Sequence, residues 1–230
     1  MRREKKSVVR RWLIFFVGII VMSFGIVLMI EADLGVAPWD VLHIGLTKQF
    51  GLTVGTWSIL VGFCIIGLTT LLTKEWPPLG AFLNMIFVGV FIDIFRLFIG
   101  TPVTILGQYV MLLVGVVVIG YGIGFYIAPK CGAGPRDSLM IAITEKSAWK
   151  VQYVRGLMEI IVLAIGWNLG GPVFIGTILF SLTIGNVVGF TLPQCQRLVD
   201  RFIERGMKIE NIDKGTIRVN DHDGISKEVR

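Results

Sequence analysis

Six long runs of apolar residues alternate with short polar connections along this chain of 230 residues. The runs cover residues 12–30, 54–73, 77–99, 103–128, 151–169 and 172–193. Each is close to the roughly 20 residues that a helix needs to cross about 30 Å of hydrocarbon. Glycines interrupt the runs, and polar and apolar positions do not alternate strictly, which favours helices over a membrane β-barrel. The pattern therefore predicts an all-α membrane protein with six transmembrane helices.

The most polar stretch between these runs occurs twice. Residues 35–42 and 132–139 both read Gly-x-x-Pro-x-Asp-x-Leu, and they lie 97 residues apart. Three predicted spans per copy is an odd number, so the second copy should lie upside down relative to the first. We therefore predict two inverted 3+3 repeats, residues 12–99 and 103–193, with the first motif entering from outside and the second from the cytoplasm. Inverted repeats are a recurring plan of transporters, whose site lies between the repeats.

The distribution of charge gives the predicted orientation. Hydrophobic residues make up 54% and charged residues 17% of the chain, which is too little charge for a soluble domain. The net charge of +6 comes largely from residues before the first span, so it does not indicate a nucleic-acid partner. These residues are Arg2, Arg3, Lys5, Lys6, Arg10 and Arg11. The positive-inside rule then places both termini in the cytoplasm, namely residues 1–11 and residues 194–230. Within the tail, residues 194–207 read as an amphipathic helix and the remainder as a flexible segment.

Nothing in the sequence indicates an enzyme. The three cysteines are far apart and odd in number, and we interpret them as free thiols. The sequence has no phosphate-binding loop, no cluster with metal-ligand spacing and no nucleophile beside a recognisable partner. We therefore expect no enzymatic activity, no metal and no cofactor.

Each repeated motif predicts the start of a short helix, at residues 38–50 and 135–146. Pro38 and Pro135 suit the first helical turn, where their missing N–H costs nothing, and Gly35 and Gly132 allow the chain to reverse beforehand. One interpretation is a pair of re-entrant half-helices whose N-termini face each other across the membrane. The alternative is a pair of helices lying flat at the two interfaces, with the motif aspartates as simple caps.

The candidate site follows from these motifs. Asp40, Asp137 and Arg136, with Pro38, Pro135, Gly35 and Gly132, are the predicted substrate-binding residues. Three further residues, His43, Arg155 and Glu159, are candidates for coupling or gating. His43 lies one helical turn after Asp40, which suits a proton relay but equally a capped helix with a wet histidine. Arg155 and Glu159 share a helix face inside an apolar run, as a functional pair or as a structural ion pair. Asn84 is a further polar residue that could line a cavity or bond across helices.

The paired motif, the six-span plan and the basic N-terminus resemble the YczE/YyaS/YitT family of bacterial multi-pass membrane proteins. The stretches 35–42 and 132–139 carry the resemblance, which covers about residues 10–197 and is closest to the YczE-like branch. The chain differs from YitT-type members, whose chains end in a separate soluble domain. The resemblance implies a bacterial plasma membrane location. It suggests transport and links to secondary metabolism, without a settled substrate, and it supplies no catalytic residues.

Three functions remain as hypotheses at this point. The first is a small secondary transporter or exporter of a polar or anionic small molecule. The second is a passive channel, since two opposed half-helices in inverted repeats resemble the aquaporin plan by analogy alone. The third is a non-transporting accessory protein that recruits a partner enzyme. The expected partners are the lipid bilayer and an unknown solute, and a homo-oligomer is left open.

Overall fold

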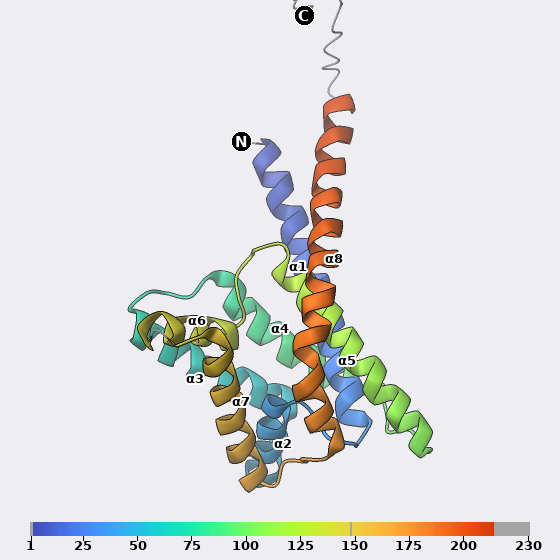
Figure 1. The fold of residues 1–230 in the computed structure, drawn as a ribbon. Helices are drawn as coiled ribbons and strands as arrows, with labels where there is room; N and C mark the ends of the chain where they lie inside the picture. Colours follow the sequence, from blue (N-terminus) through green and yellow to red (C-terminus); the bar gives the residue numbers. More distant parts are fainter. Residues whose placement is uncertain (1, 148, 214–230) are drawn as a thin grey trace, which may run out of the picture.

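The computed structural model describes residues 2–147 and 149–213, and the side chains of residues 8–147 and 149–202. All regular structure in these residues is helical (Figure 1). The helices are α1 (Arg2–Glu31), α2 (Pro38–Phe50), α3 (Val54–Thr73), α4 (Leu79–Arg96), α5 (Ile105–Ile127), α6 (Pro135–Ser147), α7 (Val151–Asn168) and α8 (Ile175–Asp213). The start of α1 and the end of α8 lie at the same end of the molecule (Figure 1).

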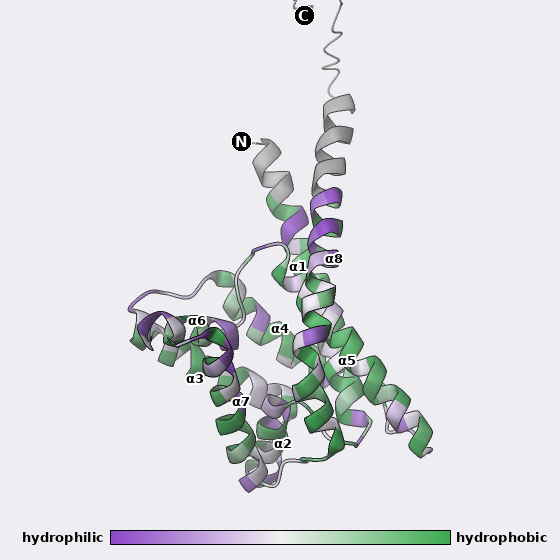
Figure 2. Ribbon diagram, in the orientation of Figure 1, coloured by the Kyte–Doolittle hydropathy of each residue, from purple (hydrophilic) through white to green (hydrophobic). Residues whose placement is uncertain are grey.

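Five of the described helices are long and apolar enough to cross a membrane. The candidate membrane spans are Val8–Glu31, Val54–Thr73, Leu79–Arg96, Ile105–Ile127 and Ile175–Phe202. Many of their large apolar side chains are exposed, as expected for surfaces that contact lipid. The ribbon of these helices is coloured mostly as hydrophobic in Figure 2. Helix α7, the fifth of the six predicted spans, does not meet this standard, because Gln152, Arg155, Glu159 and Asn168 interrupt its apolar residues. The protein is therefore an integral membrane protein whose described residues form only helices, and the sixth predicted span is not confirmed.

The predicted helices agree with the observed ones except at some of their ends. The helices at residues 38–50 and 54–73 occur as predicted, and α6 extends one residue beyond the prediction. Helix α1 begins ten residues before the predicted first span, within the basic N-terminal segment. The predicted sixth span and the amphipathic segment at 194–207 form one helix, α8, which continues through Pro193 to Asp213. Residues 208–213, predicted as flexible, therefore belong to α8, and 214–230 lie outside the described residues.

Helices α1 and α5 form the centre of the fold. Gly18 packs on Tyr126 and Gly25 on Ile119, so the two helices run antiparallel. A Cβ at Gly18 would overlap the Tyr126 backbone, and one at Gly122 would overlap the backbone of Met22. Small residues at such crossings let membrane helices approach closely enough for van der Waals packing to hold them together. The largest apolar core surrounds this pair and includes Phe15, Ile19, Val116, Ile119 and Tyr126.

The two halves of the chain are interlocked through their short helices. Helices α2 and α6 have 13 residues each and begin at prolines that lie 97 residues apart. Helix α2 packs against α7 of the second half, and α6 packs against α3 of the first half. Lys48 and Gln49, at the C-terminal end of α2, donate hydrogen bonds to the carbonyls of Gly170 and Leu169, just after α7 ends. Since the C-terminal end of α6 leads into the start of α7, the two short helices end at opposite ends of α7.

Candidate functional site

A cavity of about 160 Å³ lies where the N-terminal ends of α2 and α6 meet. All eight helices contribute to its wall. Much of the wall is apolar, formed by Met, Ile, Val and Phe side chains such as Met22, Ile65, Met85, Ile123 and Phe180. The polar and charged side chains that line it are Asp40, His43, Ser58, Asn84, Tyr126, Arg136, Asp137, Arg155 and Glu159. The cavity is thus a mixed environment in which an apolar wall surrounds charges of both signs.

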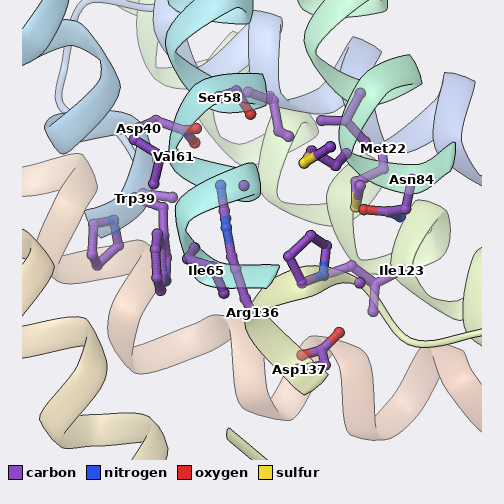
Figure 3. A pocket seen from close by; sticks show the side chains of 18 of the residues that line it. Met22, Trp39, Asp40, Ser58, Val61, Ile65, Asn84, Ile123, Arg136 and Asp137 are labelled. Atoms are coloured by element: carbon purple, nitrogen blue, oxygen red, sulfur yellow. The ribbon is translucent and has the colours of Figure 1, made fainter. Parts of the chain in front are cut away.

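The first turns of α2 and α6 contact each other inside the cavity. The guanidinium carbon of Arg136 lies 4.7 Å from the centroid of the Trp39 ring. Trp39 and Arg136 occupy the same position in the two copies of the motif, so equivalent residues of the two halves touch each other. In Figure 3, Arg136 runs alongside the Trp39 ring towards Asp40 and Ser58, whereas Asp137 points away from them. Among the described residues, no carboxylate lies within ion-pair distance of the Arg136 guanidinium.

Asp40 and His43 form a buried polar pair on α2. Asp40 is 2% exposed and His43 is 1% exposed, and both line the cavity from the first two turns of α2. The Oδ1 atom of Asp40 and the Nδ1 atom of His43 are 3.6 Å apart, and neither has a hydrogen-bond partner. The N-cap position of α2 is Ala37, which has no side-chain acceptor, and Asp40 does not take over that role within the described hydrogen bonds. The structure therefore does not place Asp40 as the simple helix cap that one interpretation predicted.

Two residues from the apolar spans complete the polar wall. The hydroxyl of Tyr126 on α5 donates a hydrogen bond of 2.7 Å to Oδ2 of Asp137. The amide nitrogen of Asn84 on α4 is buried without a partner, and the residue is 6% exposed. The sequence signalled Asn84, because an amide inside a span needs a partner or a cavity. Tyr126 was missed, because a tyrosine near the end of an apolar run is also the usual interfacial aromatic.

The remaining candidates divide into residues that line the cavity and residues that do not. Arg155 and Glu159 line it and form an ion pair of 3.1 Å, with side chains 46% and 23% exposed. Pro38 and Pro135 also line it as the first residues of their helices. Gly35 and Gly132 lie outside the wall and take positive φ angles of 103° and 139°. They act as turn residues that aim the helices, since such angles are readily available only to glycine.

The arrangement suits reversible binding of a small polar solute. A buried carboxylate, imidazole and amide without partners are costly in an apolar surrounding, so a ligand that satisfies them gains that energy. Within residues 2–147 and 149–213, no group of three His, Cys, Asp or Glu side chains is placed to hold a metal ion. The structure thus brings together around one space three pairs of residues from α2, α6 and α7, namely Asp40 and His43, Arg136 and Asp137, and Arg155 and Glu159.

Comparison with known proteins identifies the family. Residues 9–193 match a family described as "Family of unknown function (DUF6198)". The chain is 46% identical over 202 residues to the "Uncharacterized membrane protein YczE" of Bacillus subtilis (strain 168), covering 87% of this chain and 94% of that protein. It is 34% identical over 178 residues to an "Uncharacterized protein" of Haemophilus influenzae, covering 77% of this chain and 81% of the relative. It is 28% identical over 190 residues to the "Uncharacterized protein YyaS" of Bacillus subtilis, covering 81% of this chain and 94% of YyaS.

No solved structure matches this chain. The family match and the extent of the likeness to YczE cover both motifs and the helices that line the cavity. This integral membrane protein therefore belongs to the family of unknown function DUF6198, among the YczE-like membrane proteins.

Proposed function

We propose that this protein is a small secondary transporter or exporter of a polar or anionic small molecule in the bacterial plasma membrane. In this proposal six spans form two inverted 3+3 repeats, with α7 as the additional span and both termini in the cytoplasm. The short helices are re-entrant, and the solute binds between the repeats. The binding residues are Asp40, Arg136 and Asp137, and the coupling or gating residues are His43, Arg155 and Glu159.

One observation carries the proposal, namely that the N-terminal ends of α2 and α6 converge on one cavity. These helices end at opposite ends of α7, yet Trp39 and Arg136 touch at their starts. The antiparallel packing of the equivalent helices α1 and α5 also supports inversion. In an inverted repeat each helix of the second copy runs in the direction opposite to the equivalent helix of the first. Transporters of this plan direct half-helix N-termini at solute near the middle of the membrane.

The same cavity suggests how access would alternate. Its wall includes α3 and α4 from the first half, and α7 and α8 from the second half. Helices α3 and α4 pack tightly, whereas α7 and α8 are not among the packed helix pairs of the described residues. In the opposite state, α7 and α8 would pack together and α3 and α4 would separate. Alternation between the two states would open the cavity first to one side of the membrane and then to the other. Such rocking of one repeat against the other is the usual form of alternating access.

A counterflow assay with the purified protein in liposomes tests this function. Liposomes loaded with unlabelled solute take up labelled solute faster when a carrier exchanges the two. The labelled solutes are amino acids, organic acids, amines and sugars, tested in turn. We expect counterflow with at least one of them, and a drop of about tenfold or more in Asp40→Asn and in Asp137→Asn, because each removes a charge from the cavity wall.

Asp33→Asn is the matched control. Asp33 is an exposed aspartate outside the cavity wall, in a left-handed conformation that asparagine also adopts. Its counterflow should equal that of the unaltered protein. Downhill flux without counterflow would identify a channel, and no flux of any solute would favour the accessory role. Both results contradict the carrier.

A further inference from the structure

We infer that the cavity binds a zwitterion, namely an amino-acid-like solute with an ammonium group and a carboxylate group attached to a short apolar body. This inference rests on the proposed function, and it narrows the solute from any polar or anionic molecule to this class. Asp40 would bind the ammonium group, and Arg136 with Asn84 would bind the carboxylate. The apolar body would lie against the methionine and isoleucine side chains of the wall.

The balance of charge in the wall argues against a simple anion. Three carboxylates and two guanidinium groups line the cavity. Arg155 and Glu159 already pair with each other, which leaves Arg136 facing Asp40 and Asp137. An anion would add to an excess of negative charge in a poorly solvated space, where like charges repel strongly. A solute that brings its own positive charge avoids that repulsion.

The unsatisfied hydrogen-bonding groups argue against a simple cation. Arg136 has donors without a carboxylate in ion-pair range among the described residues, and the Asn84 amide nitrogen is a buried donor without an acceptor. Both need acceptor oxygens, which an amine does not supply. Oδ1 of Asp40, in contrast, is a buried acceptor without a donor. A zwitterion satisfies both kinds of group in one binding event, and each group left unmatched would weaken binding.

The size of the cavity fits the same class of solute. A volume of about 160 Å³ is close to that of the roughly 150 Å³ engineered cavity that holds benzene, so the cavity accommodates a small solute of similar size. Met22, Ile65, Met85 and Ile123 form an apolar wall, and methionine adapts to apolar bodies of different shape. An apolar or sulfur-containing amino acid meets these conditions, whereas a sugar leaves the apolar wall without a partner.

Binding to the purified protein in detergent tests the inference without any need for transport. The protein amino acids are screened by the rise in thermal unfolding temperature that a ligand of the native state produces. The best of them is then compared with its two single-charge analogues. For leucine these are 4-methylpentanoate, which lacks the ammonium group, and 3-methylbutylamine, which lacks the carboxylate. We expect the zwitterion to bind about thirtyfold or more tightly than either analogue, because each analogue leaves one charge of the cavity wall without a partner.

Two substitutions should change this preference in opposite directions. Asp40→Asn should weaken the binding of the amino acid and of 3-methylbutylamine. The binding of 4-methylpentanoate should stay the same or become tighter. Arg136→Gln should weaken the binding of the amino acid and of 4-methylpentanoate. The binding of 3-methylbutylamine should stay the same or become tighter. Lys146→Gln, an exposed residue on the same helix as Arg136 and outside the cavity wall, is the control and should bind like the unaltered protein.

The outcomes separate this inference from the proposed function. The inference is overturned if 4-methylpentanoate or 3-methylbutylamine binds as tightly as the amino acid. It is also overturned if none of the amino acids binds. If an anion both binds and shows counterflow, the transporter stands and the inferred solute class is wrong. If an amino acid binds as expected but no solute shows flux, the site stands and the proposed transport function is wrong.

Discussion

The two halves of this protein contain the same order of helices but pack their last two helices differently. Helices α3 and α4 touch through glycines, because Gly55 lies against the carbonyl of Gly89 and Gly62 lies against Met85. At the equivalent positions of the second half stand Gln152, Asn186, Glu159 and Leu182. Gln152, Asn186 and Leu182 are exposed, and Glu159 lines the cavity. The first pair is therefore closed, while the second pair stands open beside the cavity.

This difference shows that the repeated order of helices does not impose repeated packing. In other contacts the two halves are alike: α1 and α5 pack antiparallel, and each short helix, α2 or α6, packs against a helix of the other half. The pairs α3–α4 and α7–α8 are packed differently, because glycines between α3 and α4 allow a closer approach than the larger polar side chains on α7 and α8. In the proposed function these two pairs are the moving parts, so the comparison between them can be tested directly.

The largest effect is expected from joining the open pair. In a variant without Cys64, Cys131 and Cys195, the substitutions Gln152→Cys and Asn186→Cys place one thiol on α7 and one on α8. A disulfide requires Cα atoms roughly 4.4–6.8 Å apart, so it forms only when the two helices close on each other. We expect oxidation to abolish counterflow and reduction to restore it, because the link prevents the second pair from reopening.

The matched control replaces Gln152 and Leu198, which places two thiols on the same two helices at positions that closure does not bring together. This variant should not cross-link, and its counterflow should be unchanged by oxidant. Cross-linking of the first variant without any loss of flux would contradict the proposed motion.

A smaller effect is expected from adding a methyl group to each helix pair. In Gly55→Ala the new Cβ overlaps the carbonyl of Gly89, so α3 and α4 must separate. Overpacking of this kind costs about 1–3 kcal/mol, and we expect a lower thermal unfolding temperature in detergent. Gly185→Ala on α8 meets open space and should leave the stability unchanged or raise it slightly, because alanine favours a helix over glycine. Equal losses in both variants would contradict the difference between the pairs.

The smallest effect concerns how α3 and α7 begin. The Asp93 carboxylate accepts hydrogen bonds from the hydroxyl of Thr53 and, at 2.9 Å, from the N–H of Gly55, which ties α4 to the start of α3. At the start of α7, Lys150 occupies the position of Thr53 and provides no side-chain cap. We expect Asp93→Ala to lower the free energy of unfolding by about 1 kcal/mol, the usual cost of a lost helix cap. The measurement is thermal unfolding, beside Asp200→Ala at an exposed position of α8.

The sequence predicted much of the site because its residues carry local signals. A proline that starts a helix, an aspartate two residues later and a glycine before the turn identified α2 and α6 almost residue for residue. Charged residues inside apolar runs identified Arg155 and Glu159 as candidates, and both line the cavity. Trp39 and Tyr126 were not predicted as site residues, because their roles come from partners far away in the chain.

The sequence by itself determined the helical membrane class, the length of most helices and the repeated motif that begins α2 and α6, since these depend on hydrophobic periodicity and on local turn chemistry. Only the tertiary structure decided that the starts of α2 and α6 meet, and that Asp40, His43 and Asn84 remain buried without partners. It also decided that α3 and α4 pack against each other while α7 and α8 stand apart. These features arise from contacts between segments about a hundred residues apart, which depend on how side chains of different size fit together.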